Sequence, residues 1–446
     1  MKCLILAAGK GSRLCREAQS KPLYPLLGVP LIERSIRAAK AGGADAFVVV
    51  TGYRGESTTR FLEHLARRLD VSITCKHNPN WEQGNGRSVL SARRFFDGLF
   101  LLIMADHLVE AALIRDIRVD WQNVEALRLA VDTDLCNPLV DAEDVTGVRL
   151  DEEGWIRDIG KGIERADGYD TGVFLTTPAL FDALERAAAD GDTDLSAGVR
   201  LLANEGLARA VDVAGRFWID VDDPKAVKRA ERALLDRLRG KPSDGPVSRW
   251  LNRPLSTGLS RFLVKLPVTP NQISLSSFAL SVAAAFLFAV GGYAALVAGA
   301  VLAQAGSLLD GSDGEVARLK FLGTDYGGWL DAVLDRYADA LVLFGLTWHI
   351  TQGGANPVAW LAGFAAIVGS FLLSYTADKY DSRMRSRIAQ GLPGGLRLGR
   401  DVRVFLIMIG ALLSQVLSTL VIIALVMNFE TLRRLWVCRT PNGFSE

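Results

Sequence analysis

The chain has 446 residues, with 51 lysines and arginines against 50 aspartates and glutamates. Its length predicts two or three domains rather than one, and its balanced charge argues against a nucleic-acid partner. Its five cysteines form no C-x-x-C pair, which excludes a cysteine metal site and favours reduced cytosolic thiols.

Hydrophobic residues make up 49% of the chain but are unevenly distributed along it. Short apolar runs alternate with charged stretches up to about Arg239, whereas long apolar segments dominate from about Leu275 to Met427. We therefore expect a soluble domain at residues 1–240, a linker and juxtamembrane helix at 241–268, and a membrane domain at 269–446. The N-terminal apolar stretch is too short for a signal peptide, so the soluble domain is expected in the cytoplasm.

In the first half, apolar runs of strand length at residues 3–7, 46–51 and 99–104 are separated by helix-like stretches at 31–41 and 57–69. This alternation predicts a Rossmann-like α/β domain with a mainly parallel sheet. Ligands of such sheets bind at the carboxyl ends of the strands.

A glycine-rich loop, Leu6-Ala-Ala-Gly-Lys-Gly-Ser-Arg-Leu14, follows the first strand directly. Its small residues would let backbone amides approach a triphosphate; they are Ala7, Ala8, Gly9, Gly11 and Ser12. Lys10 and Arg13 add positive charge. Asp106 ends a later strand, where a carboxylate can hold a hard cation at the sheet edge.

The loop resembles the opening of the sugar-phosphate nucleotidyltransferase family, whose pattern L-A-A-G-x-G-x-R-L it matches throughout, followed by Lys21-Pro22. The resemblance implies that Arg13 and Lys21 are catalytic. It also implies two metal ligands, Asp106 and Asp220, with Asp222 as the fallback for the second. The implied reaction is attack by a substrate phosphate on the α-phosphorus of a nucleoside triphosphate, expelling pyrophosphate without a general base.

Two further segments resemble the inositol-1-phosphate cytidylyltransferase branch of that family. They are residues 78–88, and Ile159-Gly-Lys161 followed by Asp170-Thr-Gly-Val-Phe174. The resemblance implies that Asn85, Gly86 and Ser88 lie near the base and ribose. It implies equally that Lys161 and Asp170 face the phosphate of the alcohol.

Residues 247–265 place apolar side chains among arginines and a lysine, just ahead of a hydrophobic span. This pattern predicts an amphipathic helix at the membrane surface. A linker helix packed on the soluble domain is the alternative.

Apolar segments predict spans at roughly 275–291, 293–309, 330–350 and 357–376. A stretch at 396–436 is either one long helix or two around Leu413-Ser-Gln415, and two helices give an all-α domain of six spans. The loop with Arg318 and Lys320, and the loop at 379–403, are basic. The positive-inside rule then places the N-terminal domain, and the C-terminus if the last stretch crosses twice, on the cytoplasmic side of the plasma membrane.

Four carboxylates follow helical spacing in this half. Asp310 and Asp313 are three residues apart and Asp331 and Asp335 four apart, so each pair occupies one face of its helix. Carboxylates buried near a bilayer are costly without a partner, and we expect two divalent cations between them. The alternative is a solvated acidic loop, against which the apolar flanks argue.

The spacing also matches, without a gap, the signature of the CDP-alcohol phosphotransferase family. The resemblance implies that Asp310, Asp313 and Asp331 bind metal, and that Asp335 both faces the metals and is the general base. It implies nucleotide contacts for Gly314, Ala317 and Arg318. Asp339 lies one turn further along but outside the signature, and stays unassigned.

The acceptor has its own candidate residues. Arg400 and Arg403 flank the last loop, where they could hold an acceptor phosphate at the membrane surface. Basic residues at such a boundary are equally common as determinants of topology.

Taken together, the two halves resemble the family of bifunctional inositol-1-phosphate cytidylyltransferases and di-myo-inositol phosphate phosphate synthases. The resemblance implies that CTP and inositol-1-phosphate give CDP-inositol, whose phosphoinositol passes to a second inositol-1-phosphate, releasing CMP. It further implies Mg²⁺ or Mn²⁺, one ion in the soluble site and two in the membrane site, and a homodimer through the membrane helices. Two alternatives are a lipid acceptor and a soluble half that only regulates or anchors the transferase.

Overall fold

The structure is a computed structural model that describes residues 1–446 except 15–19, 122–123, 239–246, 384–398 and 440–446. The described chain divides into two compact units, Met1–Ala233 and Leu234–Glu446. The expected linker at 240–246, and most of the expected basic loop at 379–403, lie outside the described residues.

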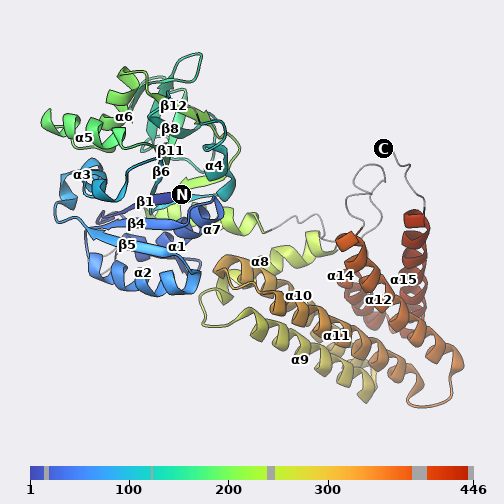
Figure 1. The fold of residues 1–446 in the computed structure, drawn as a ribbon. Coiled ribbons are helices and arrows are strands. Elements are labelled where there is room, and N and C mark those ends of the chain that lie inside the picture. The colour runs from blue at the N-terminus through green and yellow to red at the C-terminus, as the bar shows by residue number, and fades with distance from the viewer. Residues whose placement is uncertain (15–19, 122–123, 239–246, 384–398, 440–446) are drawn as a thin grey trace. The chain divides into compact units, whose positions relative to one another are not determined.

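The first unit is built on a nine-stranded sheet whose main order is β10-β9-β11-β6-β1-β4-β5, with β8 pairing β11 and β12. Strands β5, β4, β1 and β6 run parallel, whereas β11 is antiparallel to β6 and β8 (Figure 1). The strands are β1 (Lys2–Ala7), β4 (Ala46–Thr51), β5 (Ser72–His77), β6 (Phe100–Met104), β8 (Leu127–Asp132), β9 (Thr146–Leu150), β10 (Ile156–Lys161), β11 (Gly168–Thr176) and β12 (Ala208–Asp212).

Both faces of this sheet are covered by helices. Along β1, Leu4 and Leu6 enter one apolar cluster with side chains of α3, α5 and α6, whereas Cys3 and Ile5 enter another with side chains of α1, α2 and α4. A strand buried on both faces is typical of a parallel sheet between helix layers. The helices are α1 (Leu31–Ala41), α2 (Gly55–Leu69), α3 (Asn85–Leu90), α4 (Ala111–Asp116), α5 (Ala179–Ala189), α6 (Leu195–Asn204) and α7 (Pro224–Asp236). The predicted α/β class is confirmed.

Two short ribbons stand outside the large sheet. Strand β2 (Pro25–Leu26) pairs with β3 (Val29–Pro30), and β7 (His107–Val109) pairs antiparallel with β13 (Trp218–Asp220). The second ribbon places His107 directly opposite Asp220.

The second unit is helical. A π-helical turn (Ser248–Asn252) leads into α8 (Arg253–Leu263), and the long helices are α9 (Pro270–Val290), α10 (Tyr293–Lys320), α11 (Asp325–Thr351), α12 (Pro357–Arg383), α14 (Arg400–Leu412) and α15 (Val416–Arg439). Helix α9 packs against α10 and α11, and α12 packs against α15 (Figure 1).

Among the described residues, four helices are long and apolar enough to cross a membrane: α9, α10, residues 357–379 of α12 and residues 416–436 of α15. Helices α11 and α14 do not meet that criterion, so the count of six spans stays a prediction. The helix is interrupted between α14 and α15, where Ser414 has a φ of 56°. The two-helix interpretation of residues 396–436 therefore holds in the described part.

Helix α8 packs on α10. Ser256 and Ser260 are buried, and Ser256 Oγ donates a hydrogen bond of 2.8 Å to Glu315 of α10. Trp250 and Phe262 are exposed, with 86% and 62% of their surface accessible. The amphipathic segment thus buries its polar face within the second unit and presents apolar side chains outward.

Local caps explain the start of the first long helix. The Thr269 hydroxyl accepts a hydrogen bond from the backbone N–H of Gln272, whose side chain in turn accepts one from the backbone N–H of Thr269. This capping box fixes where α9 begins. At the start of α11, a Cβ on Gly327 would lie 2.9 Å from Asn271 Oδ1, so glycine at residue 327 leaves room for the Asn271 side chain of α9.

Candidate active sites

A cleft of about 520 Å³ lies in the first unit, where the chain leaves β1 and β6. Predicted site residues that line it are Ala8, Gly9, Arg13, Asn85, Ser88, Asp106, Lys161, Asp170, Asp220 and Asp222. The carboxyl ends of parallel strands are the usual ligand edge of such sheets. Ala7 is buried in β1, and Ser12 is exposed on the glycine-rich loop.

The glycine-rich loop lies over the side chain of Lys21. Gly11 has a φ of 63°, and a Cβ there would stand 2.5 Å from the Cβ of Lys21, so only glycine allows this approach. Lys21 is buried and pairs with both Asp106 and Asp222. Burial would lower the pKa of Lys21, but the charges of Asp106 and Asp222 outweigh it and hold that pKa above its ordinary value.

Asp144 brings together two predicted phosphate-binding cations. Its carboxylate pairs with Arg13 and, at 2.6 Å, with the Lys161 ammonium. Arg13 also pairs with Asp222. The side chains assigned to the nucleotide and to the alcohol phosphate therefore meet at one acidic residue that the sequence patterns did not single out.

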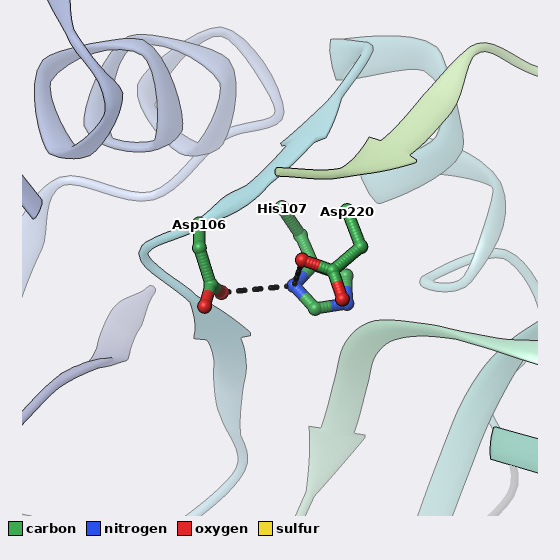
Figure 2. Close-up of side chains that lie close together, drawn as sticks. All are labelled: Asp106, His107 and Asp220. Atoms are coloured by element: carbon green, nitrogen blue, oxygen red, sulfur yellow. Dashed lines mark hydrogen bonds and ion pairs between the residues drawn. The ribbon is translucent and has the colours of Figure 1, made fainter. Parts of the chain in front are cut away.

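The first acidic cluster consists of Asp106, His107 and Asp220 (Figure 2). One ligand atom from each lies within 4.8 Å of the others, and His107 Nδ1 is 3.0 Å from Asp106 and 3.9 Å from Asp220. Asp220 Oδ1 is buried and has no hydrogen-bond partner among the described residues. Asp222 points instead to Lys21 and Arg13, so Asp220 rather than the fallback belongs to the cluster.

Electrostatics in this cluster favour a bound cation. Burial, together with the nearby charges of Asp106 and Asp222, raises the pKa of Asp220 to about 7 against the opposing effect of His107. Burial lowers the pKa of His107, but Asp220 and Asp106 outweigh it and raise that pKa to about 9. Two carboxylates and an imidazole around a carboxylate oxygen that accepts no hydrogen bond from the described residues fit a divalent ion. Such an ion would take over the charge compensation that a protonated His107 provides.

The residues predicted near the base also make contacts that hold the fold together. Asn85 Oδ1 accepts a hydrogen bond of 2.7 Å from the backbone N–H of Leu195, at the start of α6. Gly86 is buried, and a Cβ there would stand 2.6 Å from the carbonyl oxygen of Thr193. Ser88 is hydrogen-bonded to Asn78 at 3.0 Å.

Burial raises the pKa of Asp170, which also lines the cleft, to about 6.

The second acidic cluster lies between α10 and α11. Asp310, Asp331 and Asp335 each place one carboxylate oxygen within 4.8 Å of the others. Asp313 lies one turn along α10 from Asp310 but outside this group, and Ser274 of α9 donates a hydrogen bond to it. Three carboxylates so close together fit a divalent cation, because their mutual repulsion needs a positive partner.

Arg400 supplies positive charge to the same cluster. Its guanidinium pairs with Asp310 at 3.0 Å, with Asp335, and with Asp339 at 3.5 Å. Arg403 is buried and pairs with Asp339, to which Ser370 also donates at 3.1 Å. The two arginines predicted for the acceptor phosphate therefore lie against the carboxylates. The other predicted nucleotide contacts, Gly314, Ala317 and Arg318, lie on α10, with Arg318 exposed.

Comparison with known proteins agrees with this division. Residues 3–210 match the MobA-like NTP transferase domain, and residues 267–432 match the CDP-alcohol phosphatidyltransferase family. A relative from Rubrobacter xylanophilus, named bifunctional IPC transferase and DIPP synthase, is 38% identical over 441 residues, covering 97% of this chain and 95% of its own. The chain belongs to the family of bifunctional IPC transferases and DIPP synthases.

Two other similarities cover one unit each. The archaetidylinositol phosphate synthase of Pyrococcus horikoshii is 31% identical over 206 residues, which is 46% of this chain and 95% of the relative. A solved structure of the inositol-1-phosphate CTP transferase from T. maritima covers 52% of this chain and 94% of its own, with 23% identity and a TM-score of 0.47.

For this member of the bifunctional IPC transferase and DIPP synthase family, sequence reasoning missed three residues that lie at the candidate sites, His107, Asp144 and Ser274, and it named Asp339 without assigning it a role. His107 adjoins Asp106, and Ser274, Ser277 and Ser281 recur at helical spacing on α9, facing α10. The adjacency of His107 to Asp106 and the helical spacing of the three serines could both have been recognised in the sequence. Asp144 had no comparable signal, because its partners lie 131 and 17 residues away.

Proposed function

We propose that the chain catalyses two consecutive reactions. The first unit joins CTP to inositol-1-phosphate, giving CDP-inositol and pyrophosphate. The second unit transfers phosphoinositol from CDP-inositol to a second inositol-1-phosphate, giving di-myo-inositol phosphate phosphate and CMP. The observation that carries this proposal is the presence in one family member of two carboxylate clusters, one beside the buried Lys21 and the other paired with the partly buried Arg400.

In the first reaction, a phosphate oxygen of inositol-1-phosphate attacks the α-phosphorus of CTP, and pyrophosphate leaves. The second pKa of a phosphate monoester is about 6, so the nucleophile is already charged at neutral pH and no residue must remove a proton. Arg13 and Lys21 neutralise the triphosphate, and Lys161 holds the attacking phosphate once it replaces Asp144 as the partner of that lysine. Backbone amides around Gly9 and Gly11 bind phosphate oxygens.

In the second reaction, a hydroxyl of the acceptor attacks the phosphorus that carries inositol, and CMP leaves. Asp335 accepts the hydroxyl proton, because it lies in the carboxylate cluster and is held by Arg400. Gly314, Ala317 and Arg318 contact the CDP moiety, and Arg400 and Arg403 attract the phosphate of the acceptor.

Both clusters are proposed as sites for Mg²⁺ or Mn²⁺. Asp106 and Asp220 would hold one ion, with His107 beside them, and Asp310, Asp313, Asp331 and Asp335 would hold two. Divalent ions supply charge neutralisation and alignment of the reacting phosphates. They would add to the positive charge with which Lys21 and Arg400 already offset the repulsion between the carboxylates.

The second unit is proposed to lie in the plasma membrane, with the first unit and the C-terminus on the cytoplasmic side. Basic residues at the ends of α10 and α15, among them Lys320 and Arg434, support this orientation through the positive-inside rule. The family resemblance supports a homodimer through the membrane helices.

A lipid acceptor is the second candidate. The Pyrococcus relative named archaetidylinositol phosphate synthase matches 46% of the chain, and exposed Trp250 and Phe262 on the segment before α9 suit contact with a bilayer. In that case the second reaction would give a phospholipid.

Labelled CTP and inositol-1-phosphate, incubated with the full chain in detergent, distinguish these routes. Added lipid hydroxyl is present in a parallel reaction. We expect pyrophosphate release, followed by CMP that carries the CTP label and by a phosphodiester that stays in the aqueous phase, where a separate label on the inositol follows it. A product that partitions into the organic phase supports the lipid route, and no turnover supports a regulatory or anchoring first unit.

A further inference from the structure

One carboxylate of the first unit is fully buried without a cation among the described residues. Asp132, the last residue of β8, has none of its surface exposed. Its Oδ2 accepts hydrogen bonds from Trp218 Nε1 and Asn137 Nδ2, both at 2.7 Å, and its Oδ1 accepts one from the backbone N–H of Asp134 at 3.1 Å. Burying a charge is costly unless every oxygen is satisfied, and here three neutral donors satisfy it.

The first donor belongs to the ribbon that carries Asp220. Trp218 opens β13, a strand of three residues that pairs with β7 and stands outside the nine-stranded sheet. Side chains two residues apart in a strand share a face, so Trp218 and Asp220 share one. The indole bond to Asp132 therefore fixes the end of a short ribbon to a strand of the large sheet.

The other donors belong to the segment that carries Asp144. Asp134 and Asn137 open the loop between β8 and β9, and further along that loop Asp144 pairs with Arg13 and Lys161. The buried carboxylate of Asp132 thus holds two segments that reach the cleft. One carries Asp220 of the first acidic cluster, and the other carries Asp144, which pairs with Arg13 and Lys161.

We propose that Asp132 is a positioning residue for the first reaction: it sets the place of Asp220, and so the affinity of the first cluster for its divalent cation. This inference rests on the proposed role of that cluster. Asp132 touches neither substrate nor metal, because its oxygens are engaged by Trp218, Asn137 and Asp134.

The test compares Asp132→Asn with a matched control, Glu125→Gln. Asparagine has the size of aspartate but turns an N–H₂ group toward donors, which should displace Trp218. Glu125 is as deeply buried in the same unit, bonds to Arg128 and Arg209, and does not line the cleft. Trp218→Phe, which removes the indole N–H together with part of the buried ring, serves as a second variant should Asp132→Asn fail to fold.

Two readouts are used on the full chain in detergent. The first is the Mg²⁺ concentration that gives half-maximal pyrophosphate release from CTP and inositol-1-phosphate. The second is Mn²⁺ binding by electron paramagnetic resonance in an Asp331→Asn background, which weakens the second cluster so that the remaining tight site reports on the first unit.

For Asp132→Asn we expect both values to weaken by roughly tenfold, the size seen when outer groups that orient metal ligands are lost. Trp218→Phe should shift them in the same direction by less, and Glu125→Gln should lower the melting temperature without shifting either. Unchanged Mn²⁺ affinity in Asp132→Asn, or an equal shift in Glu125→Gln, overturns the inference. Wild-type chain that binds Mn²⁺ but releases no pyrophosphate contradicts the proposed function instead.

Discussion

Lys21 is the residue on which the charge balance of the first cleft depends. It is buried between Asp106 and Asp222 and lies beneath the glycine-rich loop at Gly11. A cation in this place lets Asp106 and Asp222 lie close together, and in the proposed reaction it would neutralise the phosphates of the substrate. Both effects require the positive charge of the Lys21 ammonium, and a long uncharged side chain would not provide them.

Lys21→Met should therefore abolish most of the first reaction. Methionine keeps the apolar stem but removes the charge, and we expect pyrophosphate release to fall about 100-fold or more, as for lost electrostatic groups in other transferase sites. CMP release from supplied CDP-inositol serves as the internal control and should stay at the wild-type rate. A variant that still forms CDP-inositol normally would remove Lys21 from the mechanism.

Asp331→Asn should give the reverse pattern. Asp331 lies in the cluster with Asp310 and Asp335, and an amide there removes one anionic ligand from the proposed metal pair. We expect CMP release to fall roughly 100-fold or more while pyrophosphate release is unaffected. Asp313→Asn should act in the same direction. CMP release at the wild-type rate in excess magnesium would contradict the assignment.

At the scale of elements, the second site depends on how closely α9, α10 and α11 approach one another. Gly345 of α11 lies so near α9 that a Cβ would stand 2.6 Å from the carbonyl oxygen of Ala285. Backbone cannot yield as a flexible side chain can. The placement of Asp331 and Asp335 against α9 therefore depends on a glycine that lies nearly three helical turns beyond Asp335.

Gly345→Ala is expected to push α11 from α9. We expect the melting temperature to fall by a few degrees, as for overpacking that costs about 1–3 kcal/mol, and CMP release to fall with it. Gly328→Ala on the same helix is the control for stability, because nothing lies within 4 Å of its added Cβ. Alanine there should be neutral or stabilising by up to about 1 kcal/mol. Equal melting temperatures for the Gly345→Ala and Gly328→Ala proteins would show that the contact between α9 and α11 accommodates the added Cβ, which contradicts the prediction.

At the scale of the whole molecule, the chain divides into two compact units, and the described residues form one carboxylate cluster in each. Each cluster is built from residues of its own unit. The product of the first reaction is the substrate of the second, so a defect in one unit should leave the other competent.

A mixture of Lys21→Met and Asp331→Asn proteins should therefore restore the overall reaction from CTP and inositol-1-phosphate. The Asp331→Asn protein alone should accumulate CDP-inositol, and the Lys21→Met protein alone should form none. The measurement is the appearance of CMP and the final phosphodiester after mixing. Failure to form them, with CDP-inositol present in solution, would mean that the intermediate must pass within one chain.

The sequence by itself determined the two classes of unit, and it predicted the two sets of carboxylates. These features are local: a strand, a glycine loop and a helix start are read over a few residues, and helical spacing alone places Asp310 with Asp313 and Asp331 with Asp335. The capping box at Thr269 is equally local. Such features can be recognised in the sequence without knowledge of the tertiary structure.

Only the tertiary structure decided which charges meet. The pairing of Asp144 with Arg13, of Asp220 with His107, and of Arg400 with Asp310 joins residues far apart in the chain. The same holds for Asp132 and Trp218. These contacts follow from the order of strands in the sheet and the packing of helices, which are set by the burial of the whole core rather than by any short segment.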